Sequence, residues 1–234
     1  MTAVVVLAGG LGTRLRSVVP DLPKPMAPVA GRPFLEWLLD YWIGQGIDRI
    51  VLSVGYRREI IERHFGASYR GIRVDYAVEE TPLGTGGGLL LAAALLSSER
   101  EFLLINGDTF FEVGLPRLRE FHRGRGAAWT VALFRANEAG RYMGMEVDAD
   151  MRIVSLKSGA GTPGRLANGG VYLVDTAGLA ALPWRAGSRA SLEDDIMPAV
   201  DAAGGALYGL EIDGRFIDIG VPADYLRAAE VLAA

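Results

Sequence analysis

The sequence predicts an α/β fold in which helices cover both faces of a doubly wound, mixed but mostly parallel sheet, giving three αβα layers. Short, continuously apolar, β-branched runs such as Ala3 to Leu7 are typical of strands that are buried on both faces. These runs alternate with segments whose apolar residues recur at helical spacing. Alternating strands and helices of this kind indicate a sheet in which crossover helices connect parallel strands.

The expected elements follow one another along the chain. After the first strand, we expect helices over 11–18, 34–43, 57–65, 89–96 and 115–125, and a last helix from Val221 onward. The other strands are expected over 49–54, 72–78, 102–105, 128–135 and 171–174. A chain of 234 residues suits one domain with a substantial core, so we expect residues 1–234 to form one domain.

Composition excludes several classes of function. The formal net charge is -4 and the 24 lysines and arginines form no long run, which argues against nucleic-acid binding. The chain has no cysteine, so it has neither disulfides nor thiol chemistry. No apolar stretch reaches membrane-spanning length, and the N-terminus enters a strand directly rather than a signal segment. We therefore expect a soluble, cytoplasmic protein without a membrane partner, and the sequence leaves homo-oligomer formation open.

The glycine-rich segment after the first strand indicates an anion site. Gly9, Gly10 and Gly12 allow a sharp turn and a close approach of the backbone to a ligand, and the expected helix that follows would point free N–H groups at that ligand. Arg14 adds a cation that can form two parallel bonds with phosphate oxygens. Leu15 stands where GxGxxG requires its third glycine, and no GxxxxGK[ST] is present. On residue types alone, a tight turn remains an equal alternative.

Lys24 strengthens the ligand interpretation. Pro23 and Pro25 restrict the backbone on either side, so a short rigid segment presents the ammonium in one place. The alternative is an ordinary solvated loop lysine.

Two aspartates point to a metal. Asp108 directly follows a buried strand at the edge where ligands of doubly wound sheets bind, and Mg²⁺ binds through one or two carboxylates plus substrate phosphates. Asp218 lies within an apolar run, where a lone charge is costly and a shared metal would offset the cost. For Asp108, a turn or helix-cap role is the alternative.

Several motifs together resemble one enzyme family. LAGGLGTRL with PKPM, LGTGGG (83–88), NGDTFF (106–111), NGGVY (168–172) and FIDIGVPADY (216–225) resemble the sugar-1-phosphate nucleotidyltransferases over nearly the whole chain. The run from Arg14 to Tyr41 most resembles the bacterial D-glycero-α-D-manno-heptose 1-phosphate guanylyltransferase branch. The resemblance implies a Rossmann-like fold without the C-terminal β-helix domain of some relatives, and GMP transfer from GTP to a sugar 1-phosphate with release of pyrophosphate.

The resemblance also assigns roles to residues. The nucleotide part, about 1–110, would use Glu79 to read guanine, whereas thymidylyl and uridylyl relatives tend to have glutamine at this position. From its place at the end of a strand alone, a solvated surface carboxylate is the alternative. The residues expected around GTP are Leu7, Ala8, Gly9, Gly10, Gly12, Thr13, Glu79, Gly84 and Thr85. Arg14, Lys24 and Asp108 would be catalytic, and Asp108 with Asp218 would hold Mg²⁺.

The sugar part, about 111–225, departs from the family pattern. RYG is replaced by Arg141-Tyr142-Met143-Gly144, and the usual Glu-Lys pair is missing, which leaves Lys157 as the local candidate. With Gly107, Gly144 and Asn168 it would bind the sugar phosphate, and the 159–164 loop would close over it. Asn168 capping a turn is the alternative. His64 and His122 fit no catalytic spacing and are interpreted as structural, with His122 on a solvated helix face.

Two alternative functions remain. A mannose-1-phosphate guanylyltransferase would share every motif above. A catalytically silent module that senses nucleotide sugars would also fit the fold, although it has little use for two metal carboxylates.

Overall fold

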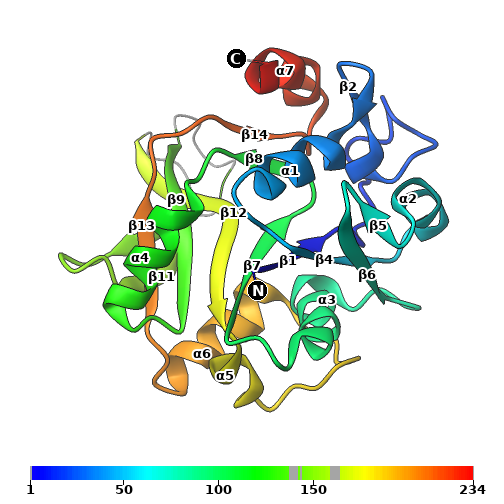
Figure 1. Cartoon of the computed structure of the whole chain (residues 1–234). Coiled ribbons are helices and arrows are strands. Elements are labelled where there is room, and N and C mark those ends of the chain that lie inside the picture. Colours follow the sequence, from blue (N-terminus) through cyan, green and yellow to red (C-terminus); the bar gives the residue numbers. More distant parts are fainter. Residues whose placement is uncertain (1, 137–141, 143, 159–163, 234) are drawn as a thin grey trace.

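The computed structural model describes residues 2–136, 142, 144–158 and 164–233. In this part of the chain a ten-stranded sheet runs through the molecule in the order β11-β10-β12-β7-β1-β4-β6-β5, with β9 paired to β12 and β13 paired to β9 (Figure 1). Its central strands run parallel: β7 (Glu101–Asn106), β1 (Ala3–Leu7), β4 (Arg49–Val54) and β6 (Ile72–Val78). The predicted mixed sheet with a parallel centre is confirmed.

The remaining strands flank this centre. β12 runs antiparallel to β7 and to β9, and β13 runs parallel to β9. Two short antiparallel pairs, β14 with β8 and β2 with β3, lie outside the main sheet. These strands are β2 (Pro28–Val29), β3 (Arg32–Pro33), β5 (Ser68–Tyr69), β8 (Thr109–Phe111), β9 (Trp129–Ala136), β10 (Gly144–Val147), β11 (Ile153–Ser158), β12 (Arg165–Asp175), β13 (Leu207–Glu211) and β14 (Phe216–Asp218).

Helices cover both faces, which confirms the three predicted layers. One face carries α1 (Phe34–Ile43), α2 (Arg58–Phe65), α4 (Leu115–Arg125) and α7 (Pro222–Ala233), whose buried apolar residues belong to one core cluster. The other face carries α3 (Gly84–Ala93), α5 (Thr176–Ala180) and α6 (Met197–Ala202), seen below the sheet in Figure 1. The short helical turns are η1 (Lys24–Met26), η2 (Ala94–Leu96) and the π-helical η3 (Leu192–Ile196).

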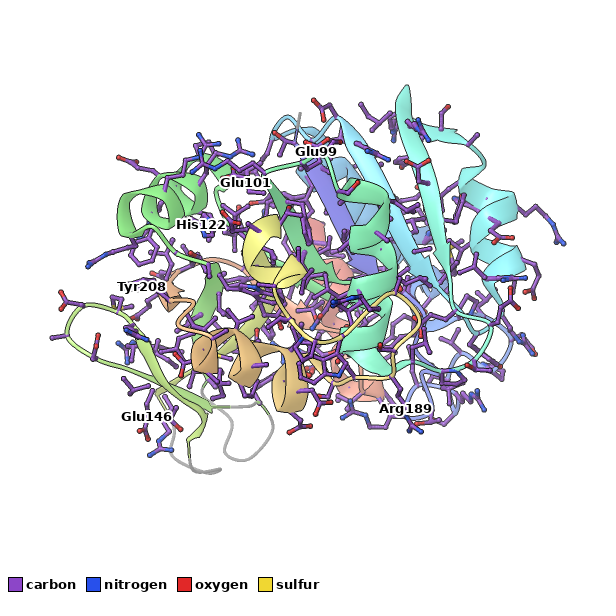
Figure 2. The ribbon with its side chains drawn as sticks, turned by 90° about the horizontal axis from the view of Figure 1, so that it is seen from below. Glu99, Glu101, His122, Glu146, Arg189 and Tyr208 are labelled. Carbon is purple, nitrogen blue, oxygen red and sulfur yellow. The ribbon has the colours of Figure 1, made fainter. Side chains whose placement is uncertain are left out.

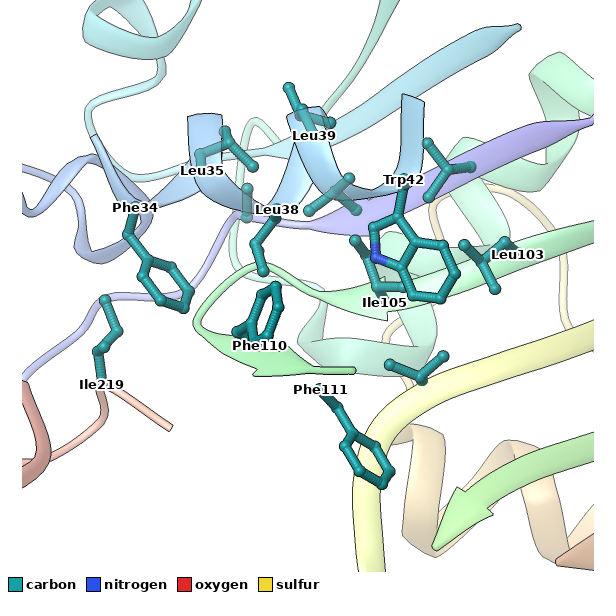
Figure 3. Close-up of a cluster of buried hydrophobic side chains, with 14 of the residues drawn as sticks. Phe34, Leu35, Leu38, Leu39, Trp42, Leu103, Ile105, Phe110, Phe111 and Ile219 are labelled. Carbon is teal, nitrogen blue, oxygen red and sulfur yellow. The ribbon is translucent and has the colours of Figure 1, made fainter. Parts of the chain in front are cut away.

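Helix α1 shows how the sequence pattern builds a layer. Its buried residues recur every three to four positions, so one face of the helix is apolar and packs on β7 and β8. Figure 3 shows this contact, with the side chains of Leu38 and Trp42 above Ile105 and Phe110. Burying each such side chain is worth about 1.5–3 kcal/mol, so this layer fixes the position of β8 firmly.

One expected helix is wrong. Residues 11–18 form successive turns, in which the Leu15 N–H donates to Gly12 O (3.1 Å) and the Val18 N–H to Leu15 O (3.0 Å). Gly12 has a left-handed φ of 58°, and Pro20 disfavours helical geometry at the residue before it. The segment therefore offers the N–H donors of a loop but no helix dipole.

Two further elements begin earlier than expected. Helix α3 starts at Gly84 rather than Leu89, and β12 starts at Arg165, so that Asn168 lies inside a strand instead of before one. Glycine is a weak helix former, but a Cβ at Gly86 would come 2.9 Å from Ser191 O. Tertiary packing therefore selects the glycines of this first turn. The other expected elements match to within one residue at each end.

Eight strands of the described part were not expected: β10, β11 and β13 of the main sheet, the short edge strand β5, and the two small pairs β14–β8 and β2–β3. Within the described residues, no helix combines the length and the apolarity that crossing a membrane would require.

Candidate active site

The carboxyl ends of the parallel strands meet at one edge of the sheet. Backbone hydrogen bonds join the segments that follow these strands: Ala8 N–H to Ser53 O (2.8 Å), Glu79 N–H to Val54 O (2.8 Å) and Gly107 N–H to Leu7 O (2.9 Å). The glycine loop, Glu79 and the Asn106-Gly107-Asp108 segment therefore share one rim, as the sequence predicted.

The two aspartates that are far apart in sequence converge at this rim. Asp218 pairs in register with Thr109 in the β14–β8 ladder, and the Ile219 N–H donates to Asp108 O (3.0 Å). Apolar neighbours hold both segments in the core: Phe110 and Ile219 lie beneath α1 near Phe34 in Figure 3. The positions of the two carboxylates are thus set by buried residues on either side of them.

Lys24 lies between these carboxylates. Its Nζ is 2.5 Å from Asp108 Oδ2 and 3.6 Å from Asp218 Oδ1, and its side chain is only 9% exposed. The short helical turn η1 carries it, with Pro25 buried. A Cβ on Gly220 would come 2.8 Å from Nζ, so this glycine keeps the path of the lysine open.

One ammonium for two carboxylates leaves an excess negative charge. Asp108 Oδ1 accepts from the Thr109 hydroxyl (3.2 Å) and Asp218 Oδ1 from the Gly220 N–H (2.6 Å), but these donors are neutral. Among the described residues, no group of three or more histidine, cysteine or acidic side chains could hold a metal. The arrangement supplies two carboxylates at most, which is the number that Mg²⁺ uses when phosphates and waters complete its shell.

A cavity of about 190 Å³ opens beside Lys24. We call it the lysine cavity, and it is lined by Leu7, Ala8, Gly10, Gly12, Thr13, Arg14, Lys24, Pro25, Asp108 and Gly220. Nearly all of these are residues that the sequence singled out. Arg14 is exposed here, so the cavity presents its guanidinium to a ligand together with the loop N–H groups.

A second cavity of about 280 Å³ adjoins it and shares Leu7, Gly10 and Asp108 with it. We call it the glutamate cavity. Its other lining residues are Gly9, Leu11, Glu79, Pro82, Gly84, Thr85 and Asn106. The two cavities form a cleft with cations and aspartates at one end and an isolated carboxylate at the other.

The Glu79 carboxylate is held on both oxygens. Oε1 accepts from the Ser53 hydroxyl (3.1 Å) and Oε2 from the Leu83 N–H (3.0 Å). The carboxylate therefore has a defined orientation at the wall of the glutamate cavity.

Comparison with known proteins agrees with this geometry. Residues 3–234 match the family model of nucleotidyl transferases. The chain belongs to the nucleotidyl transferase family. It is 41% identical to a D-glycero-α-D-manno-heptose 1-phosphate guanylyltransferase from Aneurinibacillus thermoaerophilus, over 97% of each chain.

Two further relatives and one solved structure have informative names. A Campylobacter jejuni protein of the same name is 35% identical over 94% of this chain and 96% of its own length. A Mycobacterium tuberculosis mannose-1-phosphate guanylyltransferase is 34% identical over 96% of this chain, which spans 63% of that protein. The crystal structure of HddC from Yersinia pseudotuberculosis, complexed with GMP-PN, has a TM-score of 0.84 at 34% identity, covering 98% of this chain and 99% of its own.

The expected sugar residues of this nucleotidyltransferase lie on neighbouring strands. Asn168 Oδ1 accepts from the Gly170 N–H (2.9 Å) and its Nδ2 donates to the Tyr172 hydroxyl (2.7 Å). Burial raises the pKa of Tyr172, and the charges of Glu193 and Asp108 add to the rise, so the phenol stays protonated.

The other sugar candidates are only partly described. Gly107 allows close packing, because a Cβ there would lie 2.7 Å from Leu7 O, and Gly144 pairs with Ala167 between β10 and β12. Lys157 lies in β11, but its side chain, Arg141, Met143 and residues 159–163 are outside the described part.

Sequence reasoning missed Ser53 and Gly220. Ser53 could have been noticed, because it is the single hydroxyl in the apolar run from Ile50 to Val54.

Both histidines lie outside the two cavities. His122 is 3% exposed rather than solvated, and its Nδ1 lies 2.9 Å from the Thr130 hydroxyl (Figure 2). Burial lowers its pKa and favours the neutral ring.

Proposed function

We propose that this nucleotidyltransferase moves GMP from GTP to D-glycero-α-D-manno-heptose 1-phosphate, releasing pyrophosphate and forming a GDP-sugar. The observation that carries the proposal is the cleft, in which Glu79 lines one end and Arg14, Lys24 and Asp108 line the other, where Asp218 contacts Lys24. Two relatives are named D-glycero-α-D-manno-heptose 1-phosphate guanylyltransferase, and a related structure is complexed with GMP-PN. Both findings support a guanine nucleotide in this cleft.

The base would occupy the glutamate cavity. Guanine has two adjacent donors, N1–H and the N2 amino group, and a carboxylate can accept both at once, whereas adenine offers no such pair. Gly84 and Thr85 line the same cavity and would lie against the base or ribose.

The phosphates would occupy the lysine cavity. The reaction needs no protein nucleophile, because an oxygen of the sugar phosphate attacks the α-phosphorus of GTP and pyrophosphate leaves in line. Arg14 and the N–H groups of the Gly9 to Thr13 loop would hold the triphosphate and the leaving group. Lys24 would lie between the two substrates and reduce their mutual repulsion. Catalysis is then mainly positioning and charge stabilisation.

The two aspartates suit a divalent cation. Their carboxylates already surround one cationic group, the Lys24 ammonium, so a second cation is compatible with the charge of the site. We propose Mg²⁺ as the cofactor, held by Asp108 and Asp218. When bound, Mg²⁺ supplies positive charge that neutralises phosphate oxygens.

The sugar 1-phosphate would bind beside the aspartates on the β12 side. Asn168, Gly107, Gly144 and Lys157 remain the proposed contacts. We keep the proposed division into a nucleotide part and a sugar part within one domain, and we propose that the enzyme acts in the cytoplasm, where its two phosphorylated substrates are retained.

A direct assay tests the proposal. Purified protein with Mg²⁺ and GTP is given heptose 1-phosphate or mannose 1-phosphate in parallel, and pyrophosphate release is measured. We expect the higher kcat/KM with the heptose. The mannose alternative, favoured by the Mycobacterium tuberculosis relative, would give the reverse order, and nucleotide binding without pyrophosphate release would identify a silent binding module.

Glu79→Gln tests the assignment of the base. We expect the preference for GTP over UTP and dTTP to fall by about 10-fold or more, because the amide replaces one of two acceptors by a donor. An unchanged preference would show that Glu79 does not read the base.

A further inference from the structure

Ser53 is a buried hydroxyl at the end of an apolar strand. It is 0% exposed in β4, where Ile50, Leu52 and Val54 belong to the core under α1, while Val51 belongs to the core under α3. Strand alternation therefore points Ser53 toward α3. A buried hydroxyl without a partner is costly, so its hydrogen bond partner matters.

That partner is the carboxylate proposed to read the base. Ser53 Oγ donates to Glu79 Oε1 (3.1 Å), and the Leu83 N–H donates to Oε2 (3.0 Å). Two glycines lie close to the same carboxylate: a Cβ on Gly9 would come 2.4 Å from Oε1, and one on Gly88 would come 2.9 Å from Oε1 and 2.7 Å from Ser53 Oγ. Glu79 is thus fixed by one donor on each oxygen and is open toward the glutamate cavity.

We propose that Ser53 is a specificity-determining positioning residue for the nucleobase, which acts by fixing the Glu79 carboxylate. This inference rests on the proposed guanylyl transfer. Each carboxylate oxygen has two acceptor sites, so one donor on each leaves one site per oxygen for a ligand. Held in this way, Glu79 offers two acceptors side by side, which matches the two donors of guanine. Without Ser53, Oε1 has no internal donor, and the carboxylate turns about the remaining bond to Leu83.

The two internal donors also differ in what they allow. A backbone N–H can only donate, whereas a hydroxyl can donate or accept. A glutamine at position 79 would therefore turn its oxygen toward Leu83 and its nitrogen toward Ser53. It would then offer one acceptor and one donor, which suits the N1–H and carbonyl that guanine and hypoxanthine share. Glu79→Gln should consequently lose the discrimination between these two bases.

The test compares GTP with ITP, whose base lacks the N2 amino group, and with XTP, which has a carbonyl there. The ratio of kcat/KM for GTP to that for ITP is measured with heptose 1-phosphate in wild type and Ser53→Ala. We expect wild type to prefer GTP over ITP and to use XTP least well. Ser53→Ala should lower the GTP-to-ITP ratio by about 5–10-fold. The change should lie in KM, while kcat changes by the same factor for both nucleotides. In the Glu79→Gln background, Ser53→Ala should not change the ratio further.

Thr130→Val is the matched control. It also removes a buried hydroxyl, one that is 0% exposed and bonded to His122 (2.9 Å), and it should lower the Tm without changing the ratio. If Ser53→Ala does not fold, Ser53→Cys replaces it. The expected fall in the GTP-to-ITP ratio is then smaller than for alanine, because the thiol keeps a weak donor. An active wild type whose GTP-to-ITP ratio survives loss of the Ser53 hydroxyl overturns the inference and leaves guanylyl transfer intact. A wild type that forms no product with GTP refutes guanylyl transfer itself.

Discussion

Strand β7 has an ionic cluster at each end, and the two clusters have opposite ratios of cations to carboxylates. At its start, Glu101 accepts hydrogen bonds from Arg119 (2.8 Å) and Arg123 (2.9 Å), so that two cations share one carboxylate. Beyond its end, Asp108 and Asp218 share the single ammonium of Lys24. Figure 2 shows Glu101 close to His122 of α4. The cleft lies beyond the opposite end of β7, which runs from Glu101 to Asn106.

The difference distinguishes a cluster that serves the fold from the cluster that we propose to act in catalysis. Burial alone would raise the pKa of Glu101, but the hydrogen bonds from Arg123 and Arg119 outweigh it and hold that pKa below its usual value. The protein itself therefore satisfies this charge. At the other end both described carboxylates pair with the same Lys24 ammonium, and a metal cation can balance the remaining negative charge. Mutations at the two ends should accordingly affect different quantities.

Asp108→Asn should have the largest effect, and on activity alone. We expect kcat to fall by about 10²-fold or more, since the variant loses a carboxylate charge that would hold a cation against the phosphates. Stability should change little, because relief of the repulsion between the two carboxylates offsets the loss of the Lys24–Asp108 ion pair, and Lys24 keeps Asp218 as a partner. Initial rates of pyrophosphate release, together with thermal unfolding, measure both quantities. Near wild-type turnover in a folded variant would contradict the catalytic role of Asp108.

Lys24→Met should lower both activity and stability. We expect a loss of about 10²-fold in kcat, and a loss of about 1–2 kcal/mol in the free energy of unfolding, because two partly exposed carboxylates are left facing each other. Adding Asp218→Asn should restore part of the stability and none of the activity. Urea unfolding of the single and double variants provides the comparison, and additive losses of stability would show that Lys24 is not coupled to Asp218.

The sequence predicted that Asp108 and Asp218 converge, because the signals that single out each aspartate are local. Asp108 follows a buried strand and Asp218 interrupts an apolar run, and both signals can be read without knowing which strands are neighbours. Lys24 was predicted at the same site, but facing phosphates; its contact with both aspartates depends on the packing of Gly12 and Gly220 around it.

The features that the sequence did not predict depend on tertiary contacts. Residues 11–18 have helical spacing but form turns, since Gly12 and Pro20 dominate the local geometry. Helix α3 begins with glycines because Ser53 and Ser191 leave no room for side chains. The Asn168 segment joins β12 across a register shift, which no local pattern encodes.

Glu101→Gln should lower stability without changing activity. At neutral pH we expect a loss of about 1–2 kcal/mol in the free energy of unfolding, since two charge-assisted hydrogen bonds become neutral ones. The folded-state pKa is lowered, so the stabilisation is present above the unfolded-state value and is lost as the pH falls through the folded-state value. The gap between wild type and variant should therefore close below about pH 4, as measured by urea unfolding from pH 7 to pH 3. A gap that does not depend on pH would show that packing, not charge, is lost.

The smallest effects should come from replacing Arg119 and Arg123, the two arginines of the Glu101 cluster, one at a time. Arg123 is 57% exposed and Arg119 is 26% exposed, so solvent screens the first pair more strongly. We expect Arg123→Met to cost about 0.5 kcal/mol or less, and Arg119→Met to cost more, about 1 kcal/mol, because Arg119 also donates to the Thr2 hydroxyl (3.1 Å). Thermal unfolding at low and high salt separates the two contributions, since added salt should remove the cost of Arg123→Met and only part of the cost of Arg119→Met. Equal costs that do not respond to salt would mean that the arginines act through their aliphatic stems, and the contrast between the two ends of β7 would then not be one of charge.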